Sequence, residues 1–177
     1  MVILKRKICL LGTFAVGKTS LAQRFVNDRF GDKYLTTVGI SVSKKQMPPV
    51  RSQRTGETVQ HTLLIWDIAG LEKFDTVAMN YFRGSSGALA VGDLTRPETV
   101  EGLETIIDKY LSVNPDTPLV IIGNKRDLIN DRKAVASGYR RLAADLGSEL
   151  ILTSAKTGER VADAFHFLSR KIELIDD

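Results

Sequence analysis

The sequence predicts an α/β fold built on a six-stranded, mostly parallel sheet with one antiparallel edge strand and about five helices. Short apolar runs of strand length alternate along the chain with segments in which apolar residues recur at helical spacing. Residues 38–59 differ, because polar and apolar residues alternate there, which is typical of an exposed edge hairpin. The length of 177 residues fits one domain, so we expect residues 1–177 to fold as a unit.

Five apolar runs have the length and composition of buried parallel strands. They are Ile8–Leu11, Leu63–Trp66, Ala88–Val91, Leu119–Ile122 and Leu150–Leu152. The hairpin of residues 38–59 supplies the antiparallel edge strand. Its long tip is broken by Met47-Pro48-Pro49 and by Thr55-Gly56.

Helices are predicted where apolar residues share one helical face. Three such faces are Val100, Leu103, Ile107 and Tyr110, then Val135, Tyr139, Leu142 and Leu146, and then Val161, Phe165, Leu168 and Ile172. We expect Pro97 in the opening turn of the first of these helices, where its missing amide costs nothing. An earlier segment carries Leu21 and Phe25 at helical spacing.

Composition and charge favour a soluble, cytoplasmic protein. Hydrophobic residues make up 43% of the chain, and no stretch approaches the ~20 apolar residues that cross a bilayer. The single cysteine, Cys9, lies in an apolar run, which predicts a buried thiol and a reducing compartment. The net charge of +4 is mild, and its densest basic segment, residues 44–54, falls in the hairpin. We therefore expect a solvated loop there and no nucleic-acid partner.

A phosphate-binding loop is predicted at residues 12–19. The segment Gly12-Thr13-Phe14-Ala15-Val16-Gly17-Lys18-Thr19 matches the pattern G-x-x-x-x-G-K-[ST] and stands between a strand and a helical segment. The glycines let main-chain amides turn inward around phosphates, and the helix N-terminus adds a favourable dipole. We expect Lys18 between the β- and γ-phosphates and the Thr19 hydroxyl on Mg²⁺. The alternative is a glycine-rich turn without a ligand.

Polar motifs follow three other strands. Asp67 closes one of them within Trp66-Asp67-Ile68-Ala69-Gly70 and suits Mg²⁺ through a water. In Asn124-Lys125-Arg126-Asp127, the carboxylate of Asp127 can accept hydrogen bonds from the ring N–H and the amine of guanine, a donor pair that adenine lacks. In Thr153-Ser154-Ala155-Lys156, backbone amides can reach the guanine oxygen and the stem of Lys156 can cover the ring.

In this order and spacing the motifs resemble those of a Ras-superfamily small GTPase over nearly the whole chain, and most closely those of the Rab branch. The likeness to Rab proteins comes from Val38-Gly39-Ile40, Leu64-Ile65-Trp66-Asp67 and Tyr81-Phe82-Arg83-Gly84-Ser85. The resemblance implies a three-layer P-loop GTPase fold, or G domain, which binds GTP or GDP with Mg²⁺ and acts as a molecular switch. A nucleotide kinase would need an acceptor-binding lid with several arginines, and the sequence contains no such segment.

The resemblance also implies roles for residues outside these motifs. Phe30 matches the aromatic residue that stacks edge-on to the base, Tyr34 the tyrosine that folds over the phosphates, and Thr37 the threonine that binds Mg²⁺ and the γ-phosphate. The implied metal ligands are Thr19, Thr37 and, via water, Asp67, and the implied catalytic set is Lys18, Thr37, Gly70 and position 71. The implied nucleotide contacts are Phe14, Ala15, Val16, Gly17, Lys18, Thr19, Ser20, Phe30, Tyr34, Thr37, Gly70, Asn124, Lys125, Asp127, Ser154, Ala155 and Lys156.

Two residues depart from the family pattern at the reaction centre. Leu71 stands where the family normally has a glutamine that orients the attacking water, so we expect slow hydrolysis. Two explanations for Leu71 stay open, a native residue or a replacement introduced to hold the GTP state. If it is native, a constitutively GTP-bound binding or scaffold module is the alternative function. Phe14 replaces a small residue and would obstruct an arginine supplied by an activating protein, which predicts an atypical activator or none.

Further departures concern partners. The hairpin is enlarged from Gln46 to Gln60, either as a tolerated surface insertion or as a partner contact. Relatives that work on membranes end in a prenylated tail, whereas this sequence stops at Ile175-Asp176-Asp177, so a peripheral membrane location is expected only if a lipidated tail is missing from it. We expect a monomer that binds an exchange factor and an effector at the two switch segments. Apolar candidates for that contact are Val38, Ile40, Trp66, Leu71 and Phe82, and the alternative is that several of them simply pack under the switch segments.

Overall fold

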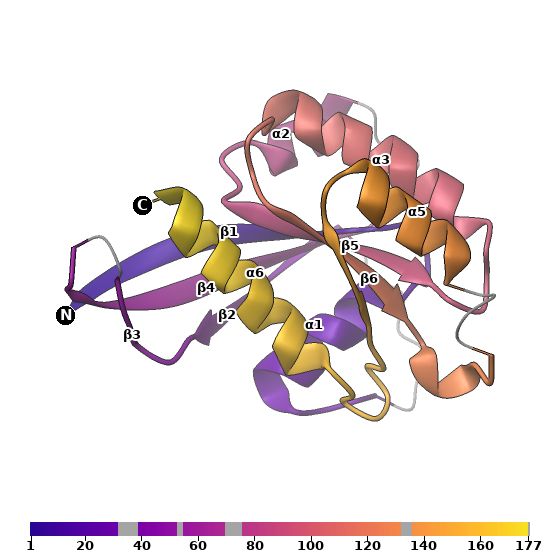
Figure 1. Cartoon of the computed structure of the whole chain (residues 1–177), viewed down its shortest axis with the longest axis horizontal. Coiled ribbons are helices and arrows are strands. Elements are labelled where there is room, and N and C mark those ends of the chain that lie inside the picture. Colours follow the sequence, from indigo (N-terminus) through magenta and orange to yellow (C-terminus); the bar gives the residue numbers. More distant parts are fainter. Residues whose placement is uncertain (32–38, 53–54, 70–75, 132–135, 177) are drawn as a thin grey trace.

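A seven-stranded sheet forms the centre of the protein. The computed structural model describes residues 1–31, 39–52, 55–69, 76–131 and 136–176. Strands follow the order β2-β4-β1-β5-β6-β7, and β3 pairs with β4 off this path (Figure 1). The strands are β1 (Val2–Leu11), β2 (Ile40–Gln46), β3 (Val50–Arg51), β4 (Thr58–Ile68), β5 (Gly87–Asp93), β6 (Leu119–Asn124) and β7 (Glu149–Leu152).

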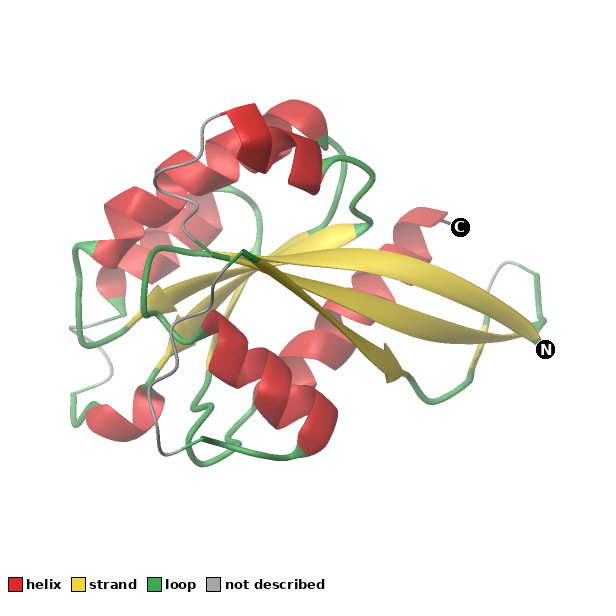
Figure 2. Cartoon of the chain, turned by 180° about the vertical axis from the view of Figure 1, so that it is seen from behind, coloured by secondary structure: helices red, strands yellow, loops and turns green. Residues whose placement is uncertain are grey.

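Helices cover both faces of the sheet, which confirms the predicted three-layer α/β architecture. Within the described residues they are α1 (Lys18–Asn27), α2 (Thr76–Phe82), α3 (Thr99–Val113), α5 (Ser137–Asp145), α6 (Val161–Asp176) and the short 3-10 turn η1 (Arg126–Leu128). Helices α1 and α6 lie on one face, and α2, α3 and α5 lie on the other (Figures 1 and 2). Among the described residues, no helix combines the length and the apolar composition that crossing a bilayer requires.

Two apolar cores lie on the two faces of the sheet. The core under α1 and α6 contains the stacked rings of Phe25 and Phe165, whose centroids are 4.0 Å apart. The core on the other face contains Cys9, which is buried as expected, and burial raises the pKa of its thiol. All four apolar residues predicted for the last helix are buried, because their spacing places them on the one helix face that packs against the sheet.

The strands are longer than the apolar runs that predicted them. Strands β1 and β4 pair in parallel from Val2 with Val59 to Leu10 with Asp67, well beyond the predicted runs. Outside those runs β1 carries the exposed apolar residues Val2 and Ile3, and β4 carries mostly polar residues, so backbone pairing continues beyond the buried apolar runs. The antiparallel pairing of β2 with β4 confirms the edge strand, but the short β3 also pairs with β4, so the sheet has seven strands rather than six.

Two helix boundaries also differ from the prediction. Helix α3 begins at Thr99, so Pro97 precedes the helix instead of occupying its opening turn. The carbonyl of Pro97 nevertheless accepts a hydrogen bond from the Val100 N–H at 3.2 Å. Helix α5 ends at Asp145, so Leu146 follows it, and Val135 lies outside the described residues.

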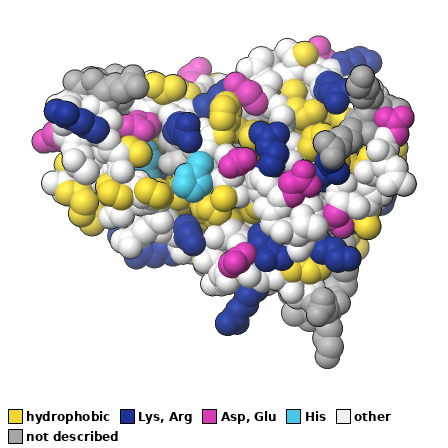
Figure 3. Space-filling view, turned by 60° about the horizontal axis from the view of Figure 1, so that its bottom comes forward, with side chains coloured by type: hydrophobic (Ala, Val, Ile, Leu, Met, Phe, Trp, Pro, Cys, Tyr) yellow, Lys and Arg dark blue, Asp and Glu magenta, His cyan; other side chains and the backbone are white. Residues whose placement is uncertain are grey.

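The enlarged hairpin packs against α6. Met47 is buried, and the ring nitrogen Nδ1 of His61 lies 3.1 Å from Oγ of Ser169 on α6. A cavity of about 240 Å³ between the two segments is lined by both histidines of the chain. On the face seen in Figure 3, histidine atoms lie beside apolar side chains, and basic and acidic groups are interspersed. This packing gives the insertion a structural role.

Gly92 on β5 is expected to tolerate no side chain, because an added Cβ would lie 2.6 Å from Cζ of Tyr139. That ring cannot withdraw cheaply, since its hydroxyl donates to the Asp93 carbonyl at 3.0 Å. We expect Gly92→Ala to lower the free energy of unfolding by about 3 kcal/mol in urea denaturation. Gly138→Ala, whose Cβ would make an ordinary 3.4 Å contact with Val100, is the control and should change it by under about 1 kcal/mol. Equal stability of the two variants would contradict this packing.

Candidate nucleotide-binding site

The predicted motifs meet at one edge of the sheet. Strands β1, β4, β5, β6 and β7 run parallel to one another, so their carboxyl ends point the same way. The segment after β1 contains residues 12–17, β4 ends next to Asp67, β6 ends at Asn124, and residues 153–156 follow β7. The topology thus brings together four motifs that are far apart in the sequence.

The loop of residues 12–17 has the backbone of an anion cradle. Ala15 has φ +62° and Gly17 has φ +105°, so the chain turns sharply before α1 begins at Lys18. A Cβ on Gly17 would overlap the Nδ2 atom of Asn124. The second glycine of the motif is therefore required both by its dihedral angle and by the close approach of β6.

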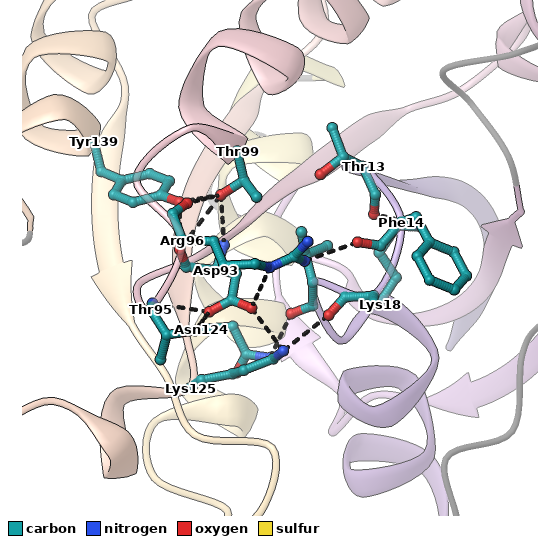
Figure 4. A network of polar contacts seen from close by, with 12 residues as sticks. Thr13, Phe14, Lys18, Asp93, Thr95, Arg96, Thr99, Asn124, Lys125 and Tyr139 are labelled. Carbon is teal, nitrogen blue, oxygen red and sulfur yellow. Dashed lines mark hydrogen bonds and ion pairs between the residues drawn. The ribbon is translucent and has the colours of Figure 1, made fainter.

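Three successive carbonyls of this loop are held by side chains from neighbouring strand ends. Nη2 of Arg96 donates to the Phe14 oxygen at 2.8 Å, and Nζ of Lys125 donates to the Ala15 oxygen at 2.9 Å. Nδ2 of Asn124 donates to the Val16 oxygen at 3.0 Å. Figure 4 shows the strand-end side chains gathered beside the loop. The loop carbonyls are thus tied to the sheet, which leaves the amides of the same peptides facing the other way.

A cation and a hydroxyl–carboxylate pair lie next to the loop. The Lys18 side chain is buried within it and its Nζ donates to the carbonyls of Gly12 and Thr13, both at 2.9 Å. The Thr19 hydroxyl donates to Oδ2 of Asp67, which is 2% exposed. A hydroxyl and a carboxylate are oxygen ligands of the kind that Mg²⁺ prefers.

The segments after β6 and β7 are bound to each other. Oδ1 of Asn124 accepts the Ala155 N–H at 3.2 Å and the Thr153 hydroxyl at 3.1 Å. The Ser154 hydroxyl donates to Oδ1 of Asp127 at 2.7 Å, which orients that carboxylate. From α1, Arg24 donates through Nε to the Ala155 oxygen at 2.9 Å, so both segments are fixed relative to the phosphate loop.

Asp93 is a central residue that the sequence analysis missed. It ends β5, is fully buried, and its Oδ2 lies 2.6 Å from Nζ of Lys125 and 3.1 Å from Nε of Arg96. Burial alone would raise the pKa of Asp93, but hydrogen bonds from Lys125, Thr95 and Arg96 outweigh it and lower that pKa. The sequence signal that could have identified Asp93 is its position at the end of an apolar run. In the structure Asp93 pairs in register with Asn124 of β6.

The side chains of several other predicted residues are exposed or half-buried, and further predicted residues lie outside the described part of the chain. Phe30 is 37% exposed and Phe14 is 57% exposed, while Ser20 is half-buried and the Lys156 side chain is exposed. Outside the described residues lie Tyr34, Thr37, Val38, Gly70 and Leu71.

One of the expected surface contacts is wrong. Phe82 is only 1% exposed, because it packs edge-on against Tyr110 with ring centroids 5.6 Å apart. Ile40 and Trp66 are half-buried, and Nζ of Lys7 lies 4.1 Å above the Trp66 ring. The sequence analysis predicted no helix over Thr76–Phe82, so no helical face indicated that Phe82 points inward.

Comparison with known proteins agrees with this geometry. The family model for the Ras family matches residues 7–174. The chain belongs to the Ras family of small GTPases. Among relatives of this Ras-family GTPase, Rab-31 of Rattus norvegicus is 34% identical over 177 residues, which are 99% of this chain and 87% of the relative. Rab-22A of Homo sapiens is 35% identical, with 99% and 88% covered, and RabC of Dictyostelium discoideum is 32% identical, with 94% and 83% covered.

Proposed function

We propose that this Rab-like molecular switch binds GTP or GDP with Mg²⁺ at the strand-end site, that it hydrolyses GTP slowly, and that its nucleotide state sets its affinity for an effector protein. The observation that carries the proposal is the meeting of two features at Asn124. Its side chain holds the Val16 carbonyl of the phosphate loop and the Ala155 amide of the segment beside Asp127. A phosphate cradle and a base-selecting carboxylate thus share one anchor.

The residues present fit a magnesium-bound triphosphate. Gly17 lets Asn124 approach the loop closely, because a Cβ there would overlap its Nδ2 atom, and Lys18 supplies a positive charge inside the loop. Thr19 and Asp67 would hold Mg²⁺, Asp67 through water, and Thr37 would complete the set. When bound, the ion neutralises charge that develops on the phosphates. The cradle would be completed by the amides of Phe14, Ala15, Val16, Gly17, Lys18, Thr19 and Ser20, together with Tyr34 and Gly70.

The base would be selected by Asp127. Its carboxylate, oriented by Ser154, would accept two hydrogen bonds from guanine, and an adenine ring would leave that charge unpaired. The segment of Ser154, Ala155 and Lys156 would bring a backbone amide to the guanine oxygen. The stems of Lys125 and Lys156 and the ring of Phe30 would enclose the base.

Slow hydrolysis rests on residue chemistry at positions 71 and 14. The isobutyl group of Leu71 can neither orient nor polarise a water molecule, so the proposed catalytic set of Lys18, Thr37 and Gly70 lacks its usual water-orienting member. Phe14 is 57% exposed on the phosphate loop, where its ring obstructs the approach of an arginine from outside. The activating protein for such a chain would be atypical.

The switch itself would be formed by the segments around Thr37 and from Gly70 to Tyr81. A γ-phosphate and Mg²⁺ would keep both segments in one ordered arrangement that an effector recognises, and hydrolysis would release them. Residues 1–177 would act as a monomeric domain. An exchange factor would reload the site with GTP.

A single-turnover time course tests the proposal. We expect the GTP-loaded chain to form GDP at a rate on the order of 10⁻⁴–10⁻³ s⁻¹ or below. Leu71→Gln should raise the rate about tenfold, because it restores one hydrogen bond to the attacking water. Chromatography of the bound nucleotide gives the rate, and Leu128→Gln on the exposed surface serves as the control.

Each other outcome of this time course has a clear meaning. Fast hydrolysis by the native chain, or a Leu71→Gln variant with an unchanged rate, would refute the role of Leu71. A chain that retains GTP indefinitely, and whose Leu71→Gln variant hydrolyses it, would instead be a constitutive GTP-bound module. Leu71 is the observation that favours this second candidate.

A further inference from the structure

Arg96 joins the phosphate loop to the end of β5. It lies in the turn between β5 and α3, and its guanidinium group contacts two partners at once (Figure 4). Nε lies 3.1 Å from the carboxylate of Asp93, and Nη2 donates to the Phe14 carbonyl at 2.8 Å. The Asp93 side chain is only 1% exposed and also binds Lys125, so this end of the bridge is fixed.

The Phe14 carbonyl determines where the next amide points. A trans peptide is planar, and its C=O and N–H bonds point in opposite directions. Arg96 holds the Phe14 oxygen on the outer side of the loop, so the Ala15 N–H must point to the inner side. In the same way Lys125 directs the Val16 N–H, and Asn124 directs the Gly17 N–H.

This peptide needs such an anchor. Ala15 has φ +62°, a left-handed conformation that costs a residue with a Cβ about 1 kcal/mol or more. Without a bond on the Phe14 oxygen, rotation of the Phe14–Ala15 peptide would relieve that strain and turn the Ala15 amide away from the cradle. Arg96 opposes this rotation from the rim of the site, where its side chain is 37% exposed.

We propose that Arg96 is a positioning residue that keeps the Ala15 amide directed at a phosphate oxygen of the bound nucleotide, and that it thereby slows nucleotide release. Asp93 sets the orientation of Arg96 and couples it to Lys125. The inference rests on the proposed function, because the ligand that it concerns is the phosphate chain of GDP or GTP. The contact of Arg96 with the loop is made to the Phe14 carbonyl, so Arg96 acts through the loop backbone.

The test is the release rate of a fluorescent GDP analogue from the full chain in excess Mg²⁺. We expect Arg96→Met to release it about tenfold faster, which corresponds to the loss of one charge-assisted hydrogen bond. Arg96→Lys retains the charge but reaches only one of the two acceptors, so its rate should lie between those of the native chain and Arg96→Met. Arg141→Met is the matched control, because that arginine is 86% exposed on α5 and should leave the rate unchanged.

A spectroscopic signature separates positioning from a general loss of stability. In ¹H–¹⁵N spectra of the GDP-bound chain, Arg96→Met should move the Ala15 amide proton upfield, while the Gly17 amide, which depends on Asn124, keeps its shift. A native release rate in Arg96→Met, or an unmoved Ala15 signal, would overturn the inference. Failure of the native chain to take up GDP would refute the proposed function itself. Loading the chain with the fluorescent GDP analogue, which precedes the release measurement, detects that failure first.

Discussion

Asp127→Ala is expected to weaken GDP binding by about 10²- to 10⁴-fold, because it removes two hydrogen bonds to a charged acceptor, each contributing about 1.5–3 kcal/mol. The Ser154 hydroxyl, 2.7 Å from Oδ1, holds the native carboxylate in place for both bonds. Affinity for ADP, which cannot use them, should stay as weak as before. Calorimetric titration of the nucleotide-free chain with GDP and ADP gives both affinities.

The ratio of the two affinities is the decisive quantity. In the native chain GDP should bind far more tightly than ADP, and in Asp127→Ala the ratio should fall toward one. Asp108→Ala is the control, because Asp108 is exposed on α3. Equal affinity of the native chain for both nucleotides, or GDP binding that survives Asp127→Ala unchanged, would refute guanine selection by this carboxylate.

Asn124→Ala should have the second large effect, because one buried side chain holds three groups from two segments of the site. The amide is 2% exposed and bonds to the Val16 carbonyl, the Ala155 N–H and the Thr153 hydroxyl. Removing it leaves these groups without partners in a water-excluded position. We expect the free energy of unfolding to fall by about 3–5 kcal/mol and GDP release to accelerate about 10²- to 10³-fold.

Urea denaturation and stopped-flow release of labelled GDP measure the two effects of Asn124→Ala. The control is Asn27→Ala, because Asn27 is exposed at the end of α1 and its loss should change neither quantity appreciably. Asn124→Asp retains the shape and one acceptor but loses the donor to Val16, so it should still release GDP quickly. A folded Asn124→Ala variant with the native release rate would show that the two halves of the site are held independently.

Much of the fold and of the site followed from local patterns. The apolar runs marked the buried centre of each parallel strand, and the motif residues followed directly on those runs. Because carboxyl ends of parallel strands meet at one edge, the sequence alone predicted that residues such as Lys18, Asn124 and Asp127 lie close together. The boundaries were less predictable, since β1 and β4 continue through mixed polar and apolar residues outside the continuous buried runs.

The individual contacts needed the tertiary structure. Arg96 and Phe14 are 82 positions apart, and His61 and Ser169 are 108 apart, so no local pattern relates either pair. Phe82 was expected at the surface, and its packing against Tyr110 buries it.

The sequence by itself determined the family, the order of the motifs and the chemistry available at each strand end, because these depend on residue type and on spacing along the chain. Only the tertiary structure decided which side chain holds which carbonyl. Asp93 became the centre of a network because β5 lies between β1 and β6, which brings its last residue next to Lys125 and beside the loop that follows β1. Hydrogen bonds act over about 3 Å, so they depend on which strand ends become neighbours in space rather than on their separation in sequence.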